Sequence, residues 1–70
     1  MSDWLKRWID AIRTAYPEPR PDAVRAYLDT FEAESLVNQI ERQRAWEDLD
    51  DQTRATLIAL NRHENPQLFP

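Results

Sequence analysis

The stretch from 21 to 46 most constrains the fold of this 70-residue chain, because it contains no glycine and no proline after Pro21. A proline fits the first turn of a helix, and good helix formers such as Ala, Arg, Glu, Gln and Leu dominate the residues after it. The apolar residues of this stretch fall into two groups on opposite sides of a helical wheel. The first group is Val24, Tyr27, Leu28 and Phe31, and the second is Leu36, Val37 and Ile40.

This change of face has two interpretations. Either the helix breaks near Ser35 and restarts, or it stays straight and buries its two halves against different neighbours. No glycine or proline marks a break, and Glu32, Ala33 and Glu34 are good helix formers. We therefore expect one straight helix over about 21–46, which needs cover on both sides.

A shorter helix is expected on each side of this central one. The first covers about 3–16, because Trp4 and Trp8 belong to a continuous apolar face and Pro17 disfavours a helical residue before it. The last covers about 51–62, because Asp50 can cap it and apolar residues come after the cap at helical spacing. Residues 66–70 are expected to form an extended tail, since Pro66 ends the helical pattern.

These elements predict an all-α bundle in a single domain, residues 1–65, with a long central helix between two short ones. The first short helix can pack on the first half of the central helix and the last on the second half. Both then leave apolar surface beside them, and a chain of this size buries only about 60% of its unfolded surface. A second copy would cover that surface. We predict a homodimer that self-associates through Leu36, Val37 and Ile40, the alternative being a compact monomeric three-helix bundle with a kink at Ser35.

The charge is unevenly distributed along the chain. The formal net charge is −4, and residues 29–51 contain eight carboxylates but only two arginines. Such a surface would repel phosphates, which argues against direct binding of nucleic acid. An acidic face can instead steer and orient a basic protein partner, although surplus Asp and Glu also simply keep a helical surface soluble.

Several kinds of chemistry have no support in the sequence. There is no cysteine for a thiolate or a zinc site, and no glycine for a loop that holds phosphate. The acidic run 47–51 lacks the spacing of a calcium-binding loop and is better explained as helix capping. His63, the single histidine, lies near a helix end far in sequence from either serine. We expect no enzyme activity, no catalytic residue, no metal and no cofactor.

The expected function is a small acidic protein-binding module in the cytoplasm, which inhibits or regulates a larger protein by surface contact. Aromatic side chains would anchor the partner and acidic ones would meet its basic, for example nucleic-acid-binding, surface. The predicted partner-binding residues are Trp4, Trp8, Tyr27, Trp46, Glu41, Glu47 and Asp48. The alternatives are a structural subunit of a larger complex and a peripheral membrane protein. Asp3 and Asp10 argue against the membrane, because they offset the basic residues on the polar face of the first helix.

The C-terminal residues permit one more specific interpretation. Gln67, Leu68 and Phe69 resemble the Gln-Leu…Leu-Phe peptides that dock into bacterial sliding clamps, but they lack the internal spacing of that motif. We expect Leu68 and Phe69 to pack against the bundle or to remain exposed at the terminus.

Overall fold

The computed structural model describes residues 3–68. All regular secondary structure in this range is helical. The elements are α1 (Asp3–Ala15), α2 (Asp22–Asp29), α3 (Leu36–Asp48), α4 (Asp51–Glu64) and the short 3₁₀ helix η1 (Pro66–Leu68). The all-α prediction is confirmed. The predicted long central helix is wrong, because α2 and α3 are separate and no helix is much longer than α1 or α4.

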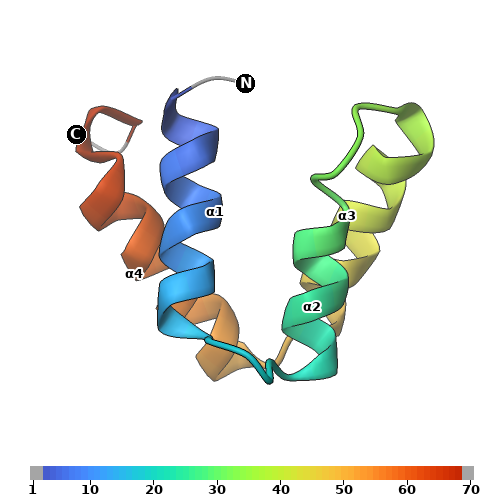
Figure 1. The fold of residues 1–70 in the computed structure, drawn as a ribbon, viewed down its shortest axis with the longest axis horizontal. Helices are drawn as coiled ribbons and strands as arrows, with labels where there is room; N and C mark the ends of the chain where they lie inside the picture. Colours follow the sequence, from blue (N-terminus) through green and yellow to red (C-terminus); the bar gives the residue numbers. More distant parts are fainter. Residues whose placement is uncertain (1–2, 69–70) are drawn as a thin grey trace.

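The four α-helices form two pairs. α1 packs along α4, and α2 packs along α3. In Figure 1 the two pairs diverge like the arms of a V, joined at its base by the connector after α1 and by the short link between α3 and α4. The first helix was expected to pack on the first half of the central segment, but its main packing partner is the last helix.

The central segment breaks at 30–35 although it contains neither glycine nor proline. The amides of Thr30, Phe31 and Glu32 each donate to the carbonyl three residues back, so the end of α2 tightens into 3₁₀-type turns. Ser35 then has an extended backbone, and its hydroxyl accepts a 3.0 Å hydrogen bond from the Asn38 amide. Ser35 is thus the N-cap that begins α3.

Side chains of α3 satisfy the carbonyl groups that the break leaves unpaired. Nη2 of Arg42 donates to the Thr30 carbonyl at 3.0 Å, and Nε donates to the Thr30 hydroxyl at 3.4 Å. The same guanidinium lies 4.2 Å from the centre of the Phe31 ring. Nδ2 of Asn38 donates to the Ala33 carbonyl at 2.8 Å. The turn therefore keeps its hydrogen bonds without continuing the helix.

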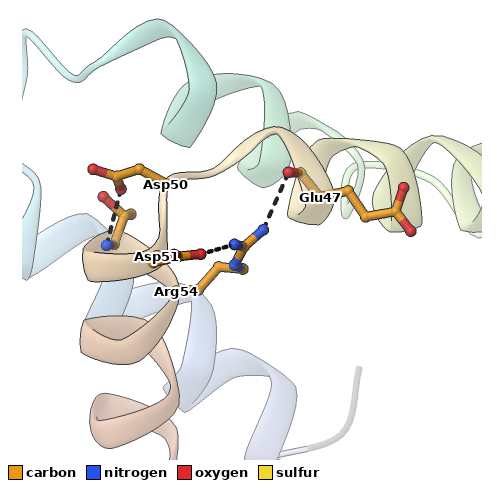
Figure 2. Close-up of polar contacts among 5 residues, drawn as sticks. Glu47, Asp50, Asp51 and Arg54 are labelled. Atoms are coloured by element: carbon orange, nitrogen blue, oxygen red, sulfur yellow. Dashed lines mark hydrogen bonds and ion pairs between the residues drawn. The ribbon is translucent and has the colours of Figure 1, made fainter.

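Figure 2 shows the link between α3 and α4, where polar side chains organise a sharp change of direction. Asp50 accepts a 2.9 Å hydrogen bond from the Thr53 amide and caps α4. Hydrogen bonds from Thr53 lower the pKa of the Asp50 carboxyl below its ordinary value. Arg54 donates to the Glu47 carbonyl at 3.1 Å and also forms an ion pair with Asp51. The acidic run thus acts in capping and in tying two helices together.

The core lies where the two pairs meet. Ile12, Val24 and Leu57 come from three different helices and are at most 1% exposed. Trp8, Tyr27, Ala45 and Leu49 complete this cluster. One polar residue is fully buried beyond it: Asn65 at the end of α4 donates from Nδ2 to Oδ1 of Asn61 at 2.9 Å. All four helices are therefore needed to close the domain.

The C-terminal segment departs from the prediction of an extended tail. Pro66–Leu68 forms a 3₁₀ turn, and the Leu68 side chain is 45% exposed. Phe69, the last residue of the sliding-clamp-like tripeptide, lies outside the described residues. Among the residues from 3 to 68, no helix is both long and apolar enough to cross a membrane.

Candidate protein-binding surfaces

The structure divides the predicted partner-binding residues between two surfaces. The four aromatic residues Trp4, Trp8, Tyr27 and Trp46 line one open groove between the arms of the V, which we call the aromatic groove. The three acidic residues Glu41, Glu47 and Asp48 lie on the exposed side of α3. Aromatic anchors and carboxylates therefore do not form one continuous site.

The aromatic groove draws on all four α-helices and has a volume of about 510 Å³. Besides the four predicted aromatic residues, it is lined by Phe31, Arg42, Ile58, Asn61 and Arg62. The ring of Tyr27 lies at its centre, with ring centroids 5.3 Å from Phe31, 5.5 Å from Trp46 and 6.5 Å from Trp8. These separations are typical of favourable aromatic pairs.

The aromatic residues differ in how far they are exposed. Trp8 and Tyr27 are only 5% and 7% exposed, so they form the floor of the groove and part of the core. Trp46 is half-buried, and Trp4 is 40% exposed. Burial raises the pKa of the Tyr27 phenol above its ordinary value, while a hydrogen bond with the Trp8 side chain and the charge of Arg42 partly oppose this shift. The side chains available for direct contact are thus Trp4 and Trp46.

The charged side chains that line the aromatic groove are both positive. Arg42 and Arg62 contribute guanidinium groups, and no Asp or Glu is among the lining residues. This is unusual for a chain with 13 acidic residues and a net charge of −4. The groove therefore differs in charge from the rest of the surface.

The second surface is the outer face of α3, defined by Leu36, Val37, Ile40, Glu41, Arg44, Glu47 and Asp48. The three apolar side chains are 72%, 67% and 51% exposed, in that order. The bend at Ser35 thus does not bring the second apolar group into the interior. Because the carboxylates come one or two turns later on the same side of the helix, this face is apolar at the start of α3 and acidic at its end.

Sequence reasoning missed part of the aromatic groove. Ile58, one of the apolar residues at helical spacing after the Asp50 cap, is 40% exposed and lines the groove. Arg42 is one of the two arginines in the acidic segment 29–51, and the charge pattern alone gives it no role. Its spacing from Trp46 was a usable signal, because residues four apart lie on the same side of a helix. Asn61 and Arg62 gave no such signal, since their position depends on the pairing of α4 with α1.

Metal binding has no candidate site in the part of the chain that the structure describes. No three His, Asp or Glu side chains between residues 3 and 68 lie close enough together to hold an ion. The carboxylates of the acidic run point in different directions, since Asp50 caps α4 and Asp51 pairs with Arg54.

No protein-family model, no curated protein and no solved structure matches the chain. The role of the two surfaces is therefore inferred from their own geometry and charge.

Proposed function

We propose that this protein is a small binding module, which regulates or inhibits a larger protein by covering part of its surface. The outer face of α3 is the contact surface. One observation carries the proposal: Leu36, Val37 and Ile40 remain at least half exposed although the core is formed by other residues. Contiguous exposed apolar side chains with polar neighbours are typical of protein-interaction sites.

The charge next to these side chains favours a basic partner. Glu41, Glu47 and Asp48 outnumber Arg44 on the same face. A positive partner surface would be drawn to this end of α3 and oriented by it, while the apolar side chains supply the area removed from water. The surface of a nucleic-acid-binding protein has this chemistry. Contact would then act by steric occlusion, without a catalytic step.

Self-association through the same three apolar residues is the second candidate, because it needs only a second copy of a surface that is present. The charge next to these residues weighs against it. In a two-fold dimer in which the two α3 helices run parallel, Glu41 and Glu47 would approach the same carboxylates of the other copy, and like charges repel. A structural subunit that assembles through α3 with a different, basic protein would avoid this repulsion.

Membrane association receives less support. The apolar face of α1 would have to contact the bilayer. Trp8, Ile9 and Ile12 of this face are at most 7% exposed and pack inside the domain.

The test compares a double serine variant with a single one in pull-downs from the native cell, with partners identified by mass spectrometry. Val37→Ser combined with Ile40→Ser should abolish capture of a basic protein. Leu68→Ser is the matched control, because Leu68 is exposed to a similar degree (45%) but lies on η1. Capture should also fall steeply between low and high salt. An identical partner set for the double variant and the wild type would refute the proposal.

Sedimentation of the purified chain separates the second candidate from the first. The binding-module proposal expects a monomer at micromolar concentration. A dimer that the Val37→Ser, Ile40→Ser variant dissociates would instead establish self-association as the role of this face.

A further inference from the structure

The aromatic groove is suited to a different ligand from the one proposed for α3. Its volume of about 510 Å³ falls within the range of roughly 300–1,000 Å³ that is usual for binding pockets. Its floor is formed by the buried rings of Trp8 and Tyr27, which are held by packing and need little rearrangement. Trp4 and Trp46 also line the groove, as does Arg42. Trp and Arg are among the residue types that most often contribute the largest share of the binding energy at protein interfaces. The groove thus provides a preformed apolar site.

Arg42 gives this site its charge preference. Its contacts are with uncharged groups: the carbonyl and hydroxyl of Thr30 and the ring of Phe31. Within residues 3–68, Nη1 of Arg42 has no hydrogen-bond acceptor, and no carboxylate forms an ion pair with this guanidinium. Because Arg42 is half-buried, a carboxylate placed beside it would be attracted more strongly than in water.

The remaining lining reinforces this preference. No carboxylate is among the side chains that line the groove. A lysine or arginine from a partner would be repelled there, whereas an Asp or Glu would meet positive charge. The outer face of α3 has the opposite preference.

We propose that the aromatic groove is a second binding site, which accepts an apolar segment of another protein that carries a carboxylate, with this carboxylate paired to Arg42. The apolar side chains of the segment contact Trp4, Trp46 and the ring floor. The carboxylate occupies the open side of the guanidinium at Nη1. The chain then has two interaction surfaces of opposite charge preference and can join a basic protein surface to an acidic peptide.

The test uses two fluorescein-labelled helical peptides of about four turns. Both present leucine at helical i, i+3, i+4 and i+7 positions, and the remaining positions are glutamate in one peptide and lysine in the other. Binding is measured by fluorescence anisotropy at low salt, with the Val37→Ser, Ile40→Ser variant, so that the outer face of α3 does not hold the lysine peptide. The net charge of −4 alone would favour the lysine peptide. The proposal expects the reverse, with the glutamate peptide bound about tenfold more tightly.

Three single variants, one of them a control, localise the binding. Arg42→Gln should weaken the glutamate peptide about tenfold and remove the preference. Arg25→Gln is the matched control, because it removes the same charge from an exposed site on α2. Trp4→Ala should weaken the glutamate peptide without affecting the core, since Trp4 is 40% exposed. This variant keeps the test decisive if loss of the Arg42 contact to Thr30 impairs folding, which circular dichroism would reveal.

The result is independent of the function proposed for α3. Val37→Ser combined with Ile40→Ser should leave the affinity for the glutamate peptide as it is in the wild type, because those residues do not line the groove. A lysine peptide that binds this double variant as tightly as the glutamate peptide does would overturn the inference. So would an unchanged affinity in Trp4→Ala, or no binding of either peptide at about 1 mM.

Discussion

The guanidinium of Arg54 donates a 3.1 Å hydrogen bond to the main-chain carbonyl of Glu47, and so ties the first turn of α4 to the last turn of α3. Arg42 forms the equivalent tie between α3 and the end of α2, through the Thr30 carbonyl at 3.0 Å. In both cases one arginine satisfies a carbonyl at a helix C-terminus, where the partial charge is negative. These two contacts connect α2 to α3 and α3 to α4, and all three helices contribute residues to the aromatic groove.

Replacing Arg54 should test the first tie. Arg54→Met removes the hydrogen bond to Glu47 and the ion pair with Asp51 while keeping much of the aliphatic stem, and should lower the free energy of unfolding by roughly 1 kcal/mol. Arg25→Met is the control, because its ion pair with Asp22 is long (3.9 Å) and exposed, and such pairs contribute little. Urea denaturation followed by circular dichroism provides the measurement. Equal losses in the two variants would mean that the Arg54 contact does not stabilise the link.

A second prediction concerns the break between α2 and α3. Ser35→Ala removes the hydroxyl that accepts from the Asn38 amide and should cost about 1 kcal/mol, whereas Ser35→Gly should cost only a few tenths. The difference arises because glycine tolerates the N-cap position better than alanine. Urea denaturation of both variants provides the comparison. If Ser35→Ala instead raised both helix content and stability, residues 21–46 would prefer one continuous helix in solution.

The break also explains what could be inferred from the sequence. The helices at 3–15 and 51–64 were predictable from strong local signals: a complete apolar face ahead of Pro17 in one case and the Asp50 cap in the other. Ser35 was an equally good cap signal, placed directly before an apolar run. The absence of glycine and proline nevertheless favoured one continuous helix over a break at Ser35. The stabilising contact from Arg42 to Thr30 spans 12 residues and cannot be read from local propensity.

The candidate surfaces were predictable to different degrees. The change of apolar face correctly indicated that Leu36, Val37 and Ile40 do not share an interior with Val24 and Tyr27. The aromatic residues could be named, but their convergence could not, since it depends on α1 packing against α4 nearly forty residues away. Pairing of distant helices is decided by the whole core rather than by any one segment.

Alkaline pH should destabilise the fold through Tyr27. Burial raises the folded-state pKa of this phenol above the value near 10 that it has in the unfolded chain. Its contribution to stability is therefore fully present below about pH 10 and is lost as the pH rises through the folded pKa. The midpoint of urea unfolding should fall more steeply above pH 10 for the wild type than for Tyr27→Phe, which has no phenol at this position. Parallel pH profiles would show that Tyr27 ionises without cost in the folded protein.

Leu57 and Ile58 are neighbours on α4, but replacing each with alanine should affect different properties: stability for Leu57 and peptide affinity for Ile58. Leu57 is fully buried among side chains of three other helices, and Leu57→Ala should cost about 2–5 kcal/mol by loss of apolar contact and creation of a cavity. Because a domain of this size is stabilised by only about 3–10 kcal/mol, much of the variant should be unfolded at room temperature. Ile58 is 40% exposed at the aromatic groove, so Ile58→Ala should leave the urea midpoint nearly unchanged and weaken the glutamate peptide instead. Similar losses of stability in the two variants would place Ile58 in the core and remove one wall of the proposed site.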